Sequence, residues 1–293
     1  MGTLRRLTVV LALSAATAVA VAGAAGADGG PSPGISLGGN GVAGPGGRLR
    51  YVAVSTDRGT LVESIRVSDG HVIHWKEIRG FFGVPIVTSD GVTGGLSQDL
   101  KTLILESYVG TPSGNTVSRF AVLDARQFRV RRTITLRGSY AFDALAPDAS
   151  TLYLIQYTSS QNANRYRVRA YDLVRGRLLA GAIVDRREPA DAMSGSPMTR
   201  VTSADGGWVY TLYARPSGSM FIHALDARHR AAACIDLPWK NVAPGALSGV
   251  RMTISGIGIV LSQRSIGRLA TVDTRTFKVS PEHAPTADGS PVG

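Results

Sequence analysis

The chain has 293 residues, with 32 lysines and arginines against 21 acidic residues and a formal net charge of +11 at pH 7. Hydrophobic residues make up 44% of it and charged residues 18%, which excludes a disordered chain, and the 35 glycines follow no triplet period that would indicate collagen. The single cysteine, Cys234, excludes an internal disulfide and a cysteine-based zinc site.

Residues 1–27 have the pattern of a secretory signal peptide. Arg5 and Arg6 form a basic start, the uncharged apolar run Leu7–Val21 follows, and small residues up to Ala27 match the pattern that signal peptidase cleaves. We therefore predict a secreted or cell-envelope protein without stable membrane insertion after cleavage. The alternative is an uncleaved anchor, for which the run is short against the ~20 residues of a membrane span. The high glycine and arginine usage is typical of a bacterium with GC-rich coding.

Residues 28–47 are rich in glycine and proline, which predicts a flexible linker. They contain the pattern G-x-G-x-x-G from Gly39 to Gly44, but no strand precedes it and no helix pattern follows, so we interpret it as linker. We predict one folded domain over residues 48–286 and a flexible tail over residues 287–293.

Across the predicted domain, apolar residues alternate in short runs separated by Gly, Asp, Ser or Pro, which indicates an all-β fold. A turn followed by an apolar strand recurs at intervals of 53, 49, 57 and 50 residues. Its aligned strand positions are Tyr51, Ile104, Tyr153, Tyr210 and Val260. A second strand ends in an aspartate at intervals of 48, 54 and 47 residues. These aspartates are Asp124, Asp172, Asp226 and Asp273.

A period of about fifty residues with about four short strands is that of a β-propeller blade. We predict a β-propeller of five four-stranded blades, or six if one blade is degenerate. Each blade has two apolar faces and must stack on its neighbours to bury them, so we expect a closed ring.

The segment Phe120–Gly138, continued by Ala146-Pro147-Asp148 and Leu152-Tyr153, resembles the YVTN-type repeat of secreted, WD-repeat-like β-propellers. The resemblance covers most of residues 90–280 and implies the propeller fold. It also implies a secreted or surface binding protein, since many members of the wider group are of that kind. Related propellers include lactonases and quinoprotein dehydrogenases, but their catalytic motifs do not occur in this chain.

Positions just before the recurring turn are expected to lie on the innermost strand and to line the central channel. The equivalent positions are Gly94, Asp143, Arg200 and Val250. The second and third of these are charged, so we predict a ligand-binding site at the channel mouth. Its residues are Asp143 and Arg200 with the flanking Phe142 and Thr199. The alternative is that the two charges only neutralise each other across the channel.

No catalytic residue is predicted. The sequence has no G-x-S-x-G nucleophile motif. His71 and His74 would lie on opposite sides of one strand, so we predict no metal site. The recurring aspartates are expected to accept backbone N–H groups at turns. No cofactor is indicated.

Two functions remain. The first is a secreted, monomeric binding scaffold that recognises a protein or an anionic envelope polymer, because arginine forks bind anionic groups well. The charges are scattered along the chain, so we predict no nucleic-acid binding. The second is a channel enzyme of the lactonase or esterase type with a divalent metal, which would need two or more carboxylate or amide ligands converging on the axis.

Overall fold

The computed structural model describes residues 34–36, 41–107, 117–159, 165–185, 187, 194–242, 244–247 and 249–286. The predicted signal peptide and the tail 287–293 lie outside these residues.

The described chain forms five antiparallel sheets, numbered I to V in chain order. Sheet I contains β2 (Val42–Ala43), β3 (Leu49–Ser55), β4 (Gly59–Arg66) and β5 (Val72–Arg79). Sheet II contains β6 (Phe82–Ile86), β7 (Thr102–Ser107), β8 (Val117–Asp124) and β9 (Val130–Arg137), with β1 (Gly34–Ser36) added beside β6. Sheet III contains β10 (Ser139–Leu145), β11 (Thr151–Tyr157), β12 (Tyr166–Asp172) and β13 (Arg177–Leu178). Sheet IV contains β14 (Ser196–Thr202), β15 (Trp208–Ala214), β16 (Met220–Asp226) and β17 (Ala231–Asp236). Sheet V contains β18 (Val250–Ser255), β19 (Gly258–Gln263), β20 (Gly267–Asp273) and β21 (Val279–Pro281). Two short 3-10 turns are η1 (Pro45–Gly47) and η3 (Pro244–Leu247).

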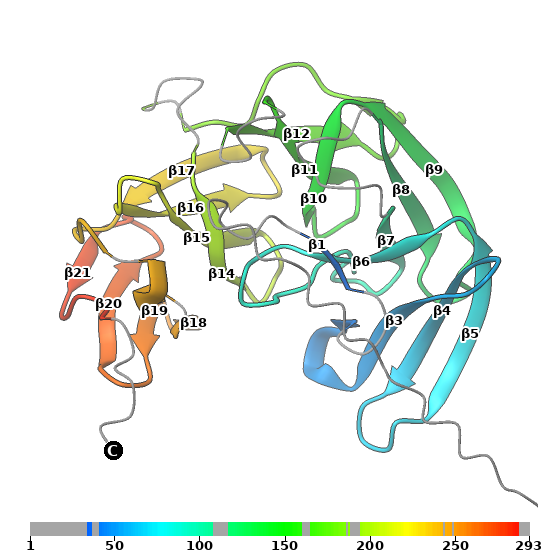
Figure 1. The fold of residues 1–293 in the computed structure, drawn as a ribbon, viewed down its shortest axis with the longest axis horizontal. Coiled ribbons are helices and arrows are strands. Elements are labelled where there is room, and N and C mark those ends of the chain that lie inside the picture. The colour runs from blue at the N-terminus through cyan, green and yellow to red at the C-terminus, as the bar shows by residue number, and fades with distance from the viewer. Residues whose placement is uncertain are drawn as a thin grey trace, which may run out of the picture.

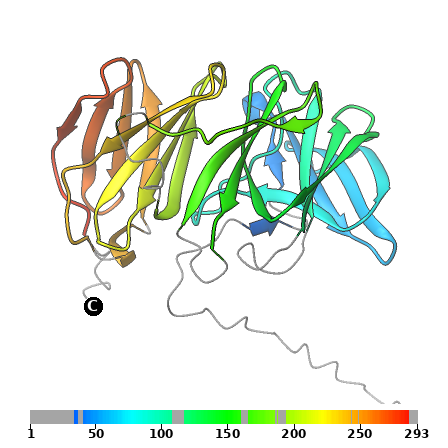
Figure 2. The same cartoon turned by 90° about the horizontal axis from the view of Figure 1, so that it is seen from above.

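The five sheets stand in chain order around one centre, as Figure 1 shows from the face and Figure 2 from above. Four hydrophobic clusters hold neighbouring sheets together, between I and II, II and III, III and IV, and IV and V. This is the predicted all-β propeller of four-stranded blades, and the number of sheets is five. The prediction from the repeat period is therefore confirmed.

The ring differs from the closed one expected from the stacking of blades. None of the hydrophobic clusters in the described part of the chain joins sheet V to sheet I. In Figure 1 these two sheets are the two ends of an arc. The repeat argument accounts for each blade packing on its neighbour, but it does not determine whether the last blade also packs on the first.

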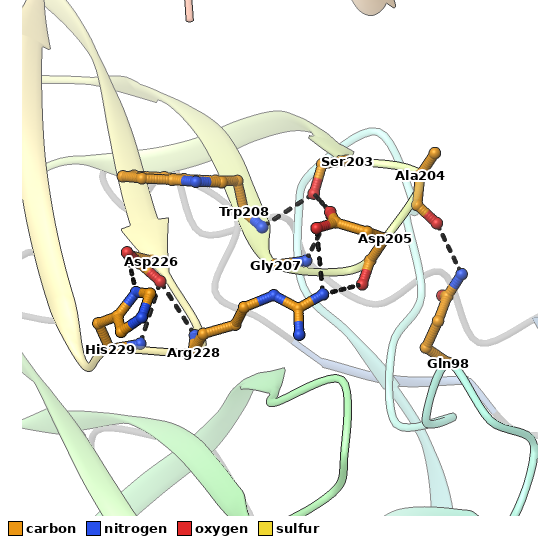
Figure 3. Close-up of polar contacts among 9 residues, drawn as sticks. All are labelled: Gln98, Ser203, Ala204, Asp205, Gly207, Trp208, Asp226, Arg228 and His229. Carbon is orange, nitrogen blue, oxygen red and sulfur yellow. Dashed lines mark hydrogen bonds and ion pairs between the residues drawn. The ribbon is translucent and has the colours of Figure 1, made fainter. Parts of the chain in front are cut away.

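The connection between β6 and β7 is long and runs through the centre of the arc to the opposite sheets. Ser89 donates a backbone hydrogen bond to the carbonyl of Pro197 at 2.9 Å, and the Gln98 side chain donates to the carbonyl of Ala204 at 2.8 Å (Figure 3). Asp90 also lies 3.9 Å from the Arg251 guanidinium of sheet V. This connection therefore links sheet II to sheets IV and V.

Two strands lie within residues 28–47, for which the composition predicts a linker. β1 pairs with β6, and β2 pairs with β3. Their apolar residues give the reason, since Val42 is buried in the cluster between sheets I and II. Gly41 allows the close approach, because a Cβ there would clash with the Tyr51 carbonyl, and its φ of +39° is strained for other residues.

The recurring aspartates cap turns, as predicted. Each accepts backbone N–H groups from the residues two and three positions later, at 2.7–3.1 Å. Figure 3 shows this turn in sheet IV, where Asp226 accepts from Arg228 and His229. The carboxylate thus replaces the bonds that the chain loses when it leaves the strand, which explains why the aspartate recurs with the blade period.

Candidate functional site

Asp143 and Arg200 meet at the inner edge of sheets III and IV. Asp143 lies in β10 at a β-bulge between Phe142 and Ala144, and Arg200 lies in β14. The Arg200 guanidinium forms an ion pair with the Asp143 carboxylate and also donates to the Asp143 backbone carbonyl. The two side chains are only 3% and 7% exposed.

The remaining bond of this guanidinium is internal as well. Arg200 Nε donates to Thr211 Oγ1 at 2.8 Å. The bulge in β10 turns Asp143 toward sheet IV, since an extra residue in a strand re-aims the side chain there. Both charges are therefore neutralised inside the fold, which is the alternative that the sequence left open beside a ligand site.

A cavity of about 200 Å³ adjoins the pair and is lined by residues of sheets I, III and IV and of the β6–β7 connection. Three of the four predicted site residues line the cavity, namely Phe142, Asp143 and Arg200. Thr202, which was not predicted, lines it as well. Thr199 is buried and pairs with Leu212 in the sheet.

The predicted equivalence of the four inner positions holds only in part. Asp143, Arg200 and Val250 lie on innermost strands, but Gly94 lies in the β6–β7 connection, where its N–H donates to the Pro85 carbonyl. Sequence alignment of the repeats missed this because the connection is an insertion between β6 and β7. A Cβ at Gly94 would clash with the ring of Phe142, so the glycine allows the connection to pass close to sheet III.

Sequence reasoning also missed a set of buried polar groups between sheets III and IV. Both ring nitrogens of His223 and the hydroxyls of Tyr157 and Ser139 have no hydrogen-bond partner among the described residues, and the Tyr166 hydroxyl interacts only with Tyr213 there. His223 is 2% exposed, and burial lowers the pKa of its imidazole to about 4. Burial likewise raises the pKa of both tyrosines. Most of the buried polar atoms without a hydrogen-bond partner among the described residues lie at this interface. Such atoms lower the stability of the fold.

Glu106 lies at the neighbouring interface, on β7. Its Oε2 accepts the backbone N–H of Phe142 at 2.9 Å. Desolvation raises the pKa of this carboxyl to about 8, because the single hydrogen bond does not offset the loss of water.

A third feature lies on the outer strands, where the sheets differ greatly in charge. The outer hairpins of sheets I and IV, residues 59–79 and 220–236, each carry equal numbers of basic and acidic residues. The β8–β9 hairpin of sheet II, residues 117–137, carries six arginines and one aspartate, a net charge of +5. The β12–β13 hairpin of sheet III, residues 166–178, carries four arginines and one aspartate, a net charge of +3. We call the outer strands of sheets II and III, β8–β9 and β12–β13, the basic wall.

Most arginines of β8–β9 are exposed and lack an acidic neighbour. In the described part of the chain, only Arg131 of this hairpin forms an ion pair, with Asp124, whose pKa this bond lowers to about 2. The others are exposed and have no carboxylate of the described residues within 4.0 Å. They are Arg119, Arg126, Arg129, Arg132 and Arg137.

The two halves of the basic wall are in contact. Arg132 Nη1 of β9 donates to the carbonyl of Leu173, in the turn after β12, at 3.1 Å. In Figure 1, sheet III follows sheet II around the centre. The signal for this surface was present in the sequence, since the charge summed over each repeat would have located it.

In the described ranges, no group of three or more His, Cys, Asp or Glu residues is placed to hold a metal ion. Nor does the described chain contain a helix that is long and apolar enough to cross a membrane.

Five antiparallel sheets around one centre, joined by successive hydrophobic clusters, define the class of this protein as a β-propeller. No protein-family model matches the chain, and no curated protein matches it in sequence. The YVTN-type family therefore stays a prediction.

Solved structures match the chain at low identity. Hydrazine synthase of Kuenenia stuttgartiensis matches with a TM-score of 0.47 and 13% identity, covering 83% of this chain and 70% of that one. The Cps50 (Swd1) β-propeller domain of Myceliophteria thermophila matches with a TM-score of 0.48 and 12% identity, covering 85% and 73%. A puromycin hydrolase matches with a TM-score of 0.49 and 17% identity, covering 88% of this chain but 40% of that one. Identities at this level bear on the fold alone.

Proposed function

We propose that this chain is a secreted β-propeller scaffold that binds an anionic partner, an envelope polymer or an acidic protein surface, through the basic wall. The observation that carries the proposal is the concentration of charge. Adjacent hairpins of sheets II and III carry net charges of +5 and +3, while those of sheets I and IV are neutral. Exposed positive charge of this density attracts anions over about one Debye length, ~8 Å at physiological salt.

Among the described residues, the arginines of the β8–β9 hairpin other than Arg131 have no carboxylate within 4.0 Å. Arg119 and Arg137 lie on one face of the hairpin, because Val117 pairs with Arg137 and side chains alternate along each strand. A rigid sheet holds these guanidinium groups in fixed positions, which favours a repeating anionic chain over a single ion.

The channel supports a different role. Asp143 is the charged carboxylate that the enzymatic alternative requires at the axis, and its oxygen is already engaged by Arg200. Binding a metal there would first have to break a buried ion pair, which costs about 3–5 kcal/mol in comparable cases. No contact in the described site favours the hydrolase over the binding scaffold.

The test removes three positive charges from the basic wall in one variant and three from the outer hairpin of sheet I in another. The polyanion affinities of the two variants are then compared. The wall variant is Arg119→Gln/Arg126→Gln/Arg137→Gln. The control is Arg66→Gln/Lys76→Gln/Arg79→Gln, which removes three exposed charges from the outer hairpin of sheet I. Both variants have the same net charge, so any difference reports position rather than total charge.

Affinity for poly-L-glutamate and for polyphosphate is measured by fluorescence anisotropy at moderate salt. We expect the wall variant to bind 10- to 100-fold more weakly, about 1.4–2.8 kcal/mol. The control should change less than threefold. Equal losses in the two variants would mean that binding follows net charge alone, and the proposed surface would then be wrong.

A further inference from the structure

A second cavity lies within the basic wall, between sheets II and III. It has a volume of about 250 Å³. Thr102 and Val122 of sheet II form one side, and Ala149, Leu173 and Val174 of sheet III form the other. Arg131 and Arg132 stand at the outer strand. The volume is below the ~300–1,000 Å³ of pockets for drug-sized ligands, so it fits one side group of a larger molecule.

Apart from Thr102 and the two arginines, the side chains that line this cavity are aliphatic. Val122 is buried, and Leu173 is partly buried against the cluster between the two sheets. Val174 is 74% exposed, although an aliphatic side chain gains free energy when it leaves water. An aliphatic group in the cavity would cover these side chains.

The two guanidinium groups differ in what they still can bind. Arg131 is paired with Asp124. Arg132 has no carboxylate within 4.0 Å among the described residues, and its Nη1 donates only to the Leu173 carbonyl. The nearby Asp172 is also occupied, since it pairs with Arg175 and accepts two turn N–H groups. One uncompensated guanidinium therefore remains beside the apolar cavity.

The backbone holds this guanidinium in place. Gly176 has a φ of +72°, and a Cβ at this position would clash with Arg132 Nη1. The glycine thus lets Arg132 lie flat against the turn after β12. A side chain fixed by backbone contacts loses little further freedom on binding, which strengthens a bidentate bond to a carboxylate.

We propose that this cavity binds a carboxylate carried on a short aliphatic group, with Arg132 holding the acid and Val122, Leu173 and Val174 covering the aliphatic part. The proposal rests on the proposed function, in that the acid would be a side group or chain end of the same anionic partner. It adds the chemistry of that partner: a carboxylate next to apolar carbon rather than a phosphate ester.

The probe is 4-methylpentanoate, titrated into the purified chain while the methyl signals of Leu173 and Val174 are followed by NMR. Three further probes separate the contributions. The neutral 4-methylpentanamide lacks the charge, acetate lacks the aliphatic group, and inorganic phosphate replaces the carboxylate. We expect each to bind at least tenfold more weakly, and the affected methyls to be those that line the cavity.

Arg132→Gln is compared with Arg129→Gln, an equal loss of charge in the same hairpin but outside the cavity lining. The first should weaken 4-methylpentanoate binding at least tenfold, and the second less than twofold. Arg132→Lys keeps the charge without the fork and should fall between them. Thermal melting of each variant checks that the fold is retained.

Equal losses in Arg132→Gln and Arg129→Gln, or acetate binding as tightly as the branched acid, would overturn the proposed pocket. These outcomes leave poly-L-glutamate binding by Arg119, Arg126 and Arg137 intact if the basic wall acts only through charge. Failure of the pocket and failure of the proposed function are therefore distinguishable.

Discussion

Arginine occurs in two contrasting settings in this propeller. Arg200, in the inner edge, is 7% exposed and donates its hydrogen bonds to Asp143 and Thr211. On the outer hairpin of sheet II, Arg119 and Arg137 are exposed and have no acidic partner among the described residues. The same side chain thus stabilises the fold in one place and remains available to a partner in the other. The number of arginines in a sequence therefore indicates a binding surface only after the arginines that pair inside the fold have been left out of the count.

The largest effect is expected at the buried pair. Arg200→Ala leaves the Asp143 carboxylate buried and uncompensated, which should lower the free energy of unfolding by about 3–5 kcal/mol. Urea denaturation at pH 7 measures this loss. The folded fraction should still bind poly-L-glutamate with wild-type affinity, because the wall is unchanged.

A double variant sharpens this result. Asp143→Leu/Arg200→Met removes both charges and should cost less than either single substitution, since no unpaired charge remains. Loss of polyanion binding in a fully folded Arg200→Ala protein would contradict the division into an internal and an external arginine.

The next effect concerns acid stability. The unfolded chain protonates His223 near pH 6.5, whereas the folded protein protonates it only near pH 4. Between these values the unfolded state takes up this proton and the folded state does not, so the contribution of His223 to stability falls as the pH falls, by about 3 kcal/mol. Glu106, whose pKa burial raises to about 8, contributes in the opposite direction over the same range. Groups that also act on this imidazole are Asp143, Arg200 and Asp185.

His223→Leu removes the titrating group and its two unpartnered nitrogens. We expect its stability at pH 7 to equal or exceed that of the wild type, and its loss between pH 6.5 and pH 4 to be smaller by that amount. Urea midpoints across this pH range measure both quantities. An unchanged pH profile in the variant would assign the acid sensitivity to other groups.

The smallest effect is expected at an exposed arginine that does have a partner. Arg228, in the turn after β16, lies 3.1 Å from the carboxylate of Asp205, in the turn after β14 (Figure 3). Both side chains are largely exposed. Arg228→Gln should lower stability by less than about 1 kcal/mol, because water and salt weaken such pairs. A loss as large as that of Arg200→Ala would remove the contrast between exposed and buried arginines.

The fold could be predicted from the sequence because the blade has a chemical marker. Asp124, Asp172, Asp226 and Asp273 each cap the same turn, so their spacing reports the blade period directly. The β6–β7 connection could not be predicted, since it occurs once and belongs to no repeat. Closure of the ring could not be predicted either. The repeat period gives the number of blades, but it does not determine whether the last blade packs against the first.

For the site, the sequence identified Asp143 and Arg200 as exceptional, and they are in contact. It did not identify the basic wall, because the repeats were compared by their strand and turn positions and not by the net charge of each repeat. The unpartnered groups around His223 had no sequence signal, since they come from two different sheets.

The most direct test of the central claim is the salt dependence of poly-L-glutamate binding, compared between the wild type and Arg119→Gln/Arg126→Gln/Arg137→Gln. If the wall binds the polymer, the plot of log Kd against log salt should become shallower, on the order of one unit of slope for each arginine that no longer pairs with a carboxylate. The sheet I control, Arg66→Gln/Lys76→Gln/Arg79→Gln, should keep the wild-type slope. Identical slopes for the wild type and the wall variant would contradict the account, because the anionic partner would then bind elsewhere.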